Sequence, residues 1–146
     1  MSEFVPDGWT SGALTDYSSL KHGYQFRTPD FADKGVRVVK IGQVLGGGRL
    51  DLDACDYVSD GVYEQRADFS LKAGDILMSL TGNIGRVSIV PQITAPLLQN
   101  YRVGLFISKV NVDRLFLYQI LSSEFVTNQL LDKSNSPITI TSDKAS

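Results

Sequence analysis

The clearest hydrophobic pattern in the chain predicts a β-hairpin over residues 76–90. Residues 76–80 form an apolar run of strand length, and residues 86–90 alternate, so that Val87 and Ile89 share one face and the intervening polar residues the other. Between them, Thr81-Gly82-Asn83-Ile84-Gly85 has the glycine content of a tight connection. We therefore predict two antiparallel strands joined by this short loop.

Three further segments have strand patterns. Val36 to Val44 is rich in β-branched residues. Leu50 and Leu52 alternate with acids and predict a short, half-exposed strand. Val103, Leu105 and Ile107 alternate with their neighbours and predict another.

Glycine and proline mark the connections. Gly46-Gly47-Gly48 predicts a flexible turn and Lys72-Ala73-Gly74-Asp75 a second turn, while Pro91 and Pro96 lie in a loop. Thr28-Pro29 is expected to be extended, because proline disfavours helix in the residue before it. Residues 10–35 and 54–72 show no clear period.

One helix is predicted late in the chain. Asp113 is a suitable N-cap for a helix from about Arg114. Its apolar face repeats at i,i+4 spacing, and Ser122-Ser123 is expected to bend or end it. The residues of that face are Phe116, Leu117, Ile120, Leu121 and Phe125. Because strands come first, we predict an α+β fold: a mixed, mostly antiparallel twisted sheet with a β-hairpin core and a late packing helix.

Composition agrees with one globular domain. The 146 residues are 42% hydrophobic and 21% charged, enough for a core without disulfides or metals. No stretch approaches the roughly 20 apolar residues of a membrane span, and the start lacks the pattern of a signal peptide, so we expect a cytoplasmic protein. Cys55, the single cysteine, lies among Asp51, Asp53 and Asp56, which disfavour its thiolate.

The charges are unevenly distributed, although the net charge is only −2. Residues 21–49 and 76–114 are predominantly basic, whereas residues 51–75 hold seven acids against Arg66 and Lys72. The net charge argues mildly against non-specific nucleic-acid binding, which usually accompanies a basic balance. The two basic blocks would form a binding surface if the fold gathers them on one face.

The sequence lacks the residues that most catalytic and cofactor chemistry requires. One histidine, His22, and one cysteine are too few for a typical zinc site, and no Gly-x-Ser-x-Gly motif accompanies His22. The triglycine is not followed by Lys-Ser/Thr, and no dinucleotide fingerprint or EF-hand spacing is present. We expect no catalytic residue, no metal and no cofactor.

Several short motifs, taken in order, resemble a known family. They are Pro6 to Trp9, Gly23 to Pro29, Gly35 to Val44, Leu71 to Val87, Gln99 to Tyr101 followed by a strand, and Phe116 to Ser123. The most specific contains Gly74-Asp75-Ile76-Leu77 and then Gly82-Asn83-Ile84-Gly85. Together, over about residues 6–141, they resemble a target recognition domain of a type I restriction–modification specificity subunit.

The resemblance implies that residues 1–146 are a single DNA target recognition domain, a non-catalytic module that reads one half of a bipartite site. It implies as partners double-stranded DNA, the modification (methyltransferase) subunit and, through it, the restriction subunit, and no membrane. In a complete specificity subunit each of two such domains precedes a long helix that sets their spacing and docks the methyltransferase. We expect that helix to be absent here, after about residue 141.

In this kind of recognition, phosphate contacts give affinity and base-edge contacts give specificity. Arg or Lys grips guanine, and Asn or Gln grips adenine, each worth roughly 1–3 kcal/mol. The resemblance and these side-chain types indicate the following DNA-binding residues: Tyr24, Arg27, Thr28, Lys40, Gln43, Arg49, Thr81, Asn83, Arg86, Asn100 and Arg102. Arg27, Gln43, Asn83 and Arg86 are the strongest, since they lie beside glycine or proline in predicted loops.

Structural alternatives stay open for several of these positions. Gly82 and Gly85 suit turn geometry as well as close approach to DNA. Tyr24, Phe26 and Tyr101 suit packing as well as stacking on bases. For the whole chain, the alternative is a protein-interaction or regulatory relative that no longer reads DNA, which the acidic balance favours. An enzyme with an unrecognised carboxylate pair is a third, weaker hypothesis.

Overall fold

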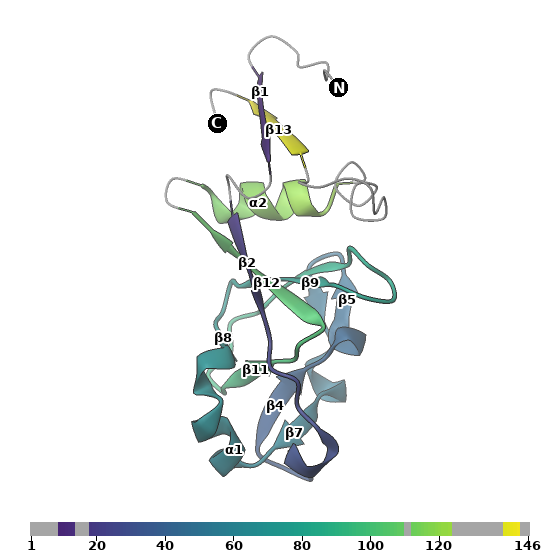
Figure 1. The fold of residues 1–146 in the computed structure, drawn as a ribbon, viewed down its shortest axis with the longest axis vertical. Helices are drawn as coiled ribbons and strands as arrows, with labels where there is room; N and C mark the ends of the chain where they lie inside the picture. Colours follow the sequence, from purple (N-terminus) through teal and green to yellow (C-terminus); the bar gives the residue numbers. More distant parts are fainter. Residues whose placement is uncertain (1–8, 14–17, 110–111, 124–138, 144–146) are drawn as a thin grey trace. The chain divides into compact units, whose positions relative to one another are not determined.

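The computed structural model describes residues 9–13, 18–109, 112–123 and 139–143 (Figure 1). Contacts divide the chain into two compact units. Residues 20–107 form one, which we call unit 2, and residues 1–19 with 108–146 form the other, unit 1. All the side chains predicted to contact DNA belong to unit 2.

Unit 2 is built mainly of short strands. A five-stranded sheet has the order β3 (Phe31–Ala32), β7 (Asp56–Val58), β4 (Val36–Val39), β11 (Leu97–Gln99), β8 (Ser70–Leu71). Its pairs are antiparallel except β4 with β11, which is parallel. A four-stranded sheet has the order β10 (Val87–Ile89), β9 (Ile76–Ser79), β12 (Val103–Ser108), β2 (Ser18–His22). A small pair joins β5 (Val44–Gly46) and β6 (Arg49–Leu50).

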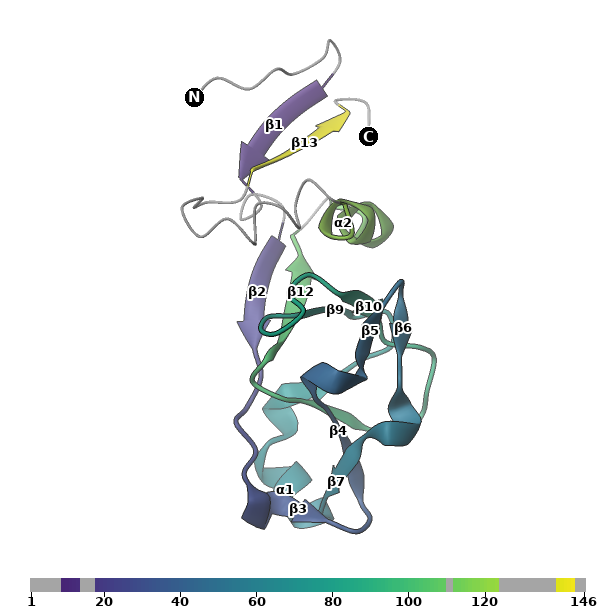
Figure 2. The same ribbon diagram turned by 90° about the vertical axis from the view of Figure 1, so that its right-hand side faces the viewer.

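The helices are short. In unit 2, α1 (Asp60–Gln65) begins at Ser59, whose hydroxyl accepts a hydrogen bond from the Val62 N–H at 3.2 Å. Four single 3-10 turns join the strands: Thr28–Asp30, Ile41–Gln43, Leu52–Ala54 and Ala67–Phe69. Unit 1 contains α2 (Arg114–Leu121) and an antiparallel pair of strands, β1 (Trp9–Ala13) and β13 (Thr139–Asp143). The two strands lie side by side in Figure 2. No helix among the described residues has the length and apolar character needed to cross a membrane.

Both faces of the five-stranded sheet are covered, because successive side chains of a strand point to opposite faces. On one face Val38 and Leu98 are fully buried, with Tyr63 of α1 packed against their cluster. On the other face Val39 and Leu97 join a cluster that extends to Leu77 of β9. The mixed, mostly antiparallel α+β fold is as predicted.

The predicted hairpin and helix are confirmed. β9 and β10 pair antiparallel, with Val87 opposite Met78. The side chain of Asp113 accepts a hydrogen bond from the Leu115 N–H at 2.8 Å, and α2 ends at Leu121, just before the serines. Leu117 and Leu121 are fully buried. The predicted face residue Phe125 lies outside the described residues.

Four details of the sequence prediction are wrong. Ser88, expected on the polar face of its strand, is fully buried because the triglycine turn packs against it, and its Oγ accepts the Gly46 N–H at 3.1 Å. The strand predicted over residues 36–44 breaks at Lys40, where the Gln43 N–H turns back to the Lys40 carbonyl at 3.0 Å. Leu52 starts a 3-10 turn rather than lying in a strand.

The fourth correction concerns Thr28-Pro29, which forms a 3-10 turn rather than an extended segment. The turn closes because the Asp30 N–H donates to the Arg27 carbonyl at 2.8 Å while the Arg27 N–H donates to the Asp30 carboxylate at 2.8 Å. Proline is tolerated here since an N–H in a first turn has no helical partner.

Candidate nucleic-acid interface

The loop between β9 and β10, which we call the recognition loop (residues 80–86), is held by one buried side chain. The Ser79 hydroxyl donates to the Asn83 carbonyl at 2.5 Å and accepts the Arg86 N–H at 3.0 Å. The Gly85 N–H donates to the Ser79 carbonyl at 3.1 Å. Gly82 and Gly85 have positive φ angles of 65° and 95°, so they serve the turn geometry. The loop is therefore tied at its base while the side chains of Thr81, Asn83 and Arg86 are exposed.

A hollow of about 650 Å³ lies beside this loop, lined by His22, Ile41, Leu80, Thr81, Gly82, Tyr101 and Arg102. The Leu80 N–H donates to the Arg102 carbonyl at 3.1 Å, which joins two of its walls. The guanidinium carbon of Arg102 lies 5.1 Å from the centre of the Tyr101 ring. Of the sequence-predicted residues, the fold thus brings Thr81 and Arg102 together in one concave, acid-free site.

The triglycine turn lies against the second strand of the hairpin. Gly46, Gly47 and Gly48 all have positive φ, and the Gly48 N–H donates to the Val87 carbonyl at 3.0 Å. This turn, predicted to be flexible, is thereby hydrogen-bonded to β10. A Cβ at Gly46 would lie 3.5 Å from the Cβ of Arg86, so the Arg86 side chain starts beside the turn. Arg49 follows in β6, and both arginines are exposed.

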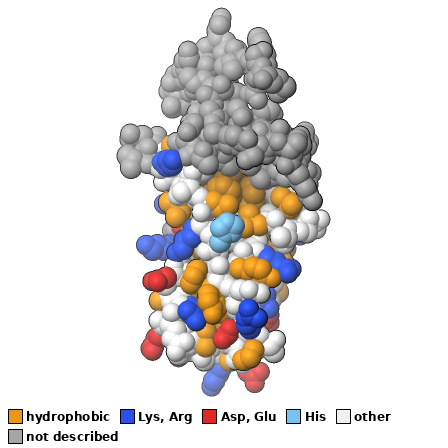
Figure 3. All heavy atoms as spheres, in the orientation of Figure 1, with side chains coloured by type: hydrophobic (Ala, Val, Ile, Leu, Met, Phe, Trp, Pro, Cys, Tyr) orange, Lys and Arg blue, Asp and Glu red, His pale blue; other side chains and the backbone are white. Residues whose placement is uncertain are grey.

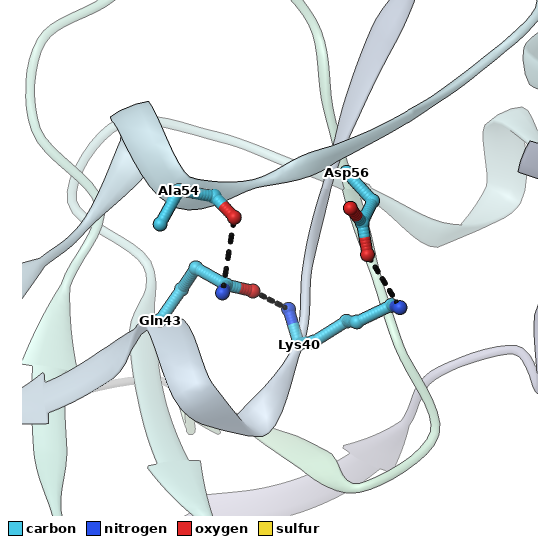
Figure 4. A network of polar contacts seen from close by, with 4 residues as sticks. All are labelled: Lys40, Gln43, Ala54 and Asp56. Atoms are coloured by element: carbon cyan, nitrogen blue, oxygen red, sulfur yellow. Dashed lines mark hydrogen bonds and ion pairs between the residues drawn. The ribbon is translucent and has the colours of Figure 1, made fainter. Parts of the chain in front are cut away.

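Lys40 and Gln43 are committed to internal contacts (Figure 4). The Gln43 side chain accepts the Lys40 N–H at 2.9 Å and donates to the Ala54 carbonyl at 3.4 Å. The Lys40 ammonium lies 2.6 Å from the Asp56 carboxylate and 4.2 Å from the centre of the Phe31 ring. Both residues therefore stabilise the break after β4, with the Gln43 amide and the charge of Lys40 engaged within the chain.

Two other candidates are packed. Tyr24 lies edge-on to Phe26 at 5.0 Å between ring centres, and the Arg66 guanidinium covers its ring at 4.1 Å. Asn100 is only 6% exposed. Arg27 and Thr28 are exposed on their 3-10 turn. The exposed candidates are Arg27, Thr28, Arg49, Thr81, Asn83, Arg86 and Arg102.

The charge distribution along the hairpin and the strand after it favours contact with an anion. From Ile76 to Ile107 the chain has Arg86 and Arg102 and no Asp or Glu. On the face of unit 2 seen in Figure 3, lysine and arginine side chains lie beside hydrophobic ones, with several acidic side chains among them. An anionic strand along residues 76–107 would therefore meet the cations of Arg86 and Arg102 and no carboxylate of the same segment.

Sequence reasoning missed His22, Ile41 and Tyr101 as lining residues of the hollow. His22 ends β2 and is exposed. No local signal joins these three residues, because their proximity depends on pairing between segments far apart in sequence. Within the described residues, no cluster of three or more His, Cys, Asp or Glu side chains could hold a metal ion.

Cys55 is a buried free thiol. Burial raises its pKa to about 11, the acids at 51, 56 and 53 add to the shift, and the Arg37 guanidinium opposes it. The unfolded thiol ionises first, so the stability contribution of protonated Cys55 is complete below pH 9 and is lost as pH rises towards 11.

We expect the free energy of unfolding of the wild type to fall over pH 9–11 more steeply than that of Cys55→Ala. Urea denaturation at several pH values measures this difference. Parallel pH profiles for the two proteins would contradict it. The native thiol should also react slowly with a disulfide reagent at pH 8, because little thiolate forms there.

Comparisons with known proteins agree on one family. The family model described as the type I restriction modification DNA specificity domain matches residues 6–142. The chain is 28% identical over 131 residues to the specificity subunit of the type I restriction enzyme MjaVIII of Methanocaldococcus jannaschii, a match that covers 86% of this chain and 31% of that protein. The chain thus spans about a third of the length of this relative.

Solved structures show the same fold. The HsdS subunit from Thermoanaerobacter tengcongensis matches with a TM-score of 0.64 and 14% identity, over 95% of this chain and 34% of that one. The S subunit of a type I restriction–modification system from M. genitalium matches with a TM-score of 0.53 and 15% identity, over 94% and 35%.

Proposed function

The chain belongs to the family of type I restriction modification DNA specificity domains, and we propose that it binds double-stranded DNA and reads one half of a bipartite site. The observation that carries this proposal is the recognition loop, which exposes polar and cationic side chains from a base fixed by buried Ser79. Base reading requires such a rigid scaffold, because hydrogen-bond discrimination depends on fixed geometry.

The position of each exposed side chain indicates whether it suits a phosphate contact or a base contact. Arg86 and Arg49 lie on or beside short turns and suit phosphate contacts, which give affinity and register. The loop side chains of Thr81 and Asn83 suit base contacts. In this proposal the module itself performs no catalysis, and its partners are the modification (methyltransferase) subunit and, through it, the restriction subunit.

Selection from a pool of random duplex DNA at low salt tests the proposal. Retained molecules should be enriched in one compact motif of about three to five base pairs, and binding should weaken as salt rises, because bound phosphates release counterions. The absence of any retention by a demonstrably folded sample would overturn the proposal. That result would favour the protein-interaction alternative.

Arg86→Ala should weaken binding to the selected site and to unrelated duplexes by a similar factor, and should reduce the salt slope by about one, as loss of a phosphate contact does. Binding isotherms at several salt concentrations measure both quantities. Lys72→Ala is the control, since Lys72 is exposed in the turn before β9, at the far end of that strand from the recognition loop. Loss confined to the selected site would instead identify Arg86 as a base reader.

A further inference from the structure

Three amides are among the side chains that the sequence predicts to contact DNA, and the fold leaves one of them free. Both functions of the Gln43 amide are engaged within the chain. Asn100 is buried. Asn83 is exposed, and its side chain makes no hydrogen bond to the described part of the chain. Of these three predicted contact residues, only Asn83 therefore presents a free carbonyl and NH₂ pair.

The backbone at Asn83 is fixed although its side chain is free. Its carbonyl accepts the Ser79 hydroxyl, and Ser79 is 1% exposed. The neighbouring Gly82 would meet nothing within 4 Å if it carried a Cβ, so the loop tip projects into open space. A projecting tip on a fixed base can enter a groove without ordering the loop on binding.

The chemistry of an amide selects its ligand. Asn accepts from adenine N6 and donates to adenine N7, and both atoms face the major groove, which is about 12 Å wide and admits a two-stranded ribbon. The minor groove, about 6 Å wide, offers no such pattern. Beside the loop, Thr81 and the Arg102 guanidinium line the hollow, and no lining residue is acidic. A DNA strand bordering the groove would meet this cation.

We propose that the recognition loop enters the major groove and that Asn83 reads an adenine through N6 and N7, while Arg102 holds the adjoining strand. This inference rests on the proposed DNA-binding function. It adds a base identity and a specificity-determining residue.

The test is a double-mutant cycle between the Asn83 side chain and the N7 atom of one adenine. After selection of the wild-type motif, each adenine of the site is replaced in turn by 7-deazaadenine, which lacks the N7 acceptor. Replacement at one position should weaken binding of the wild-type protein by about 2- to 10-fold, as loss of one hydrogen bond does. Asn83→Ala should weaken binding to the natural site by about 5- to 150-fold and should not respond to 7-deazaadenine at that position.

Two variants keep the test decisive. Asn83→Asp has nearly the same shape but lacks the NH₂ donor and adds a negative charge, so it should lose at least as much binding as Asn83→Ala. Gln92→Ala, at an exposed amide after the opposite end of β10, should bind like the wild type. Thermal melting confirms folding, which the Ser79 bond to the Asn83 backbone should preserve. A wild type that enriches no motif overturns the proposed function and this inference together. A motif without adenine, or a full 7-deazaadenine response in Asn83→Ala, overturns this inference alone.

Discussion

Gly23→Ala is expected to lower the free energy of unfolding by more than about 3 kcal/mol, or to prevent folding of unit 2. A Cβ at Gly23 would lie 2.2 Å from the Asn100 carbonyl oxygen and 2.4 Å from that of Gln99. Both are backbone atoms, so neither can rotate away. Separating the segments would also break the bond from the Tyr24 N–H to the Gln99 carbonyl, 3.1 Å long.

Gly61→Ala is the matched control. Gly61 lies in α1, and the nearest atom to an added Cβ is the Ser59 hydroxyl at 3.9 Å. Alanine has the higher helix propensity, so this variant should gain about 0.4–1 kcal/mol. Urea denaturation of both variants measures the contrast. Equal stabilities would mean that the approach of Gly23 to residues 99–100 is not rigid.

The second large effect is expected for Leu77→Ala, at about 2–5 kcal/mol of lost stability, because a cavity replaces side-chain atoms in a packed core. Leu77 is fully buried in β9, which pairs with β10 on one side and β12 on the other. Its neighbours belong to strands and cannot readily collapse into the space.

Leu115→Ala makes the same chemical change at a side chain that is 66% exposed in α2. It should change stability by no more than about 0.5 kcal/mol. Chemical denaturation with a common slope compares the pair. If both substitutions lowered the free energy of unfolding equally, that result would refute the burial of Leu77 in β9.

Local signals predicted the parts of the fold that local interactions decide. The Asp113 cap and the apolar repeat after it fix α2 within a single segment. The hairpin needs only two neighbouring strands and a glycine loop. In contrast, β11 pairs with β4, 60 residues earlier at Leu97 and Arg37, and β13 pairs with β1 across most of the chain. Residues 10–35 show no clear period and the loop around Pro91 and Pro96 was not predicted to form a strand, so neither pairing was indicated.

The errors have the same origin. Residues 36–44 contain β-branched residues both before and after Lys40, but the strand breaks there because Gln43 is bonded to Ala54 and Lys40 to Asp56. Ser88 alternates as a polar residue, yet a turn forty residues earlier covers it. The alternation of polar and apolar residues predicts which face of a strand is buried only when no distant segment packs on the other face.

The candidate interface shows this limit again. Residue type and nearby glycine placed Asn83, Arg86 and Gln43 together as strong candidates. Only the fold separates them, since it ties Gln43 down internally and leaves Asn83 and Arg86 exposed. The sequence thus predicted the candidate contact residues, and the fold decides which of them stay exposed.

The antiparallel pairing of β1 with β13 has a consequence for biosynthesis. Unit 2 is continuous in sequence and complete at Ile107, whereas β1 must wait for Asp143, about 36 residues later. At 5–20 residues per second, a ribosome adds those residues in roughly 2–7 s. The nascent chain therefore has time to form the contiguous unit first, while Trp9–Ala13 remains an unpaired strand that a chaperone could occupy until its partner emerges.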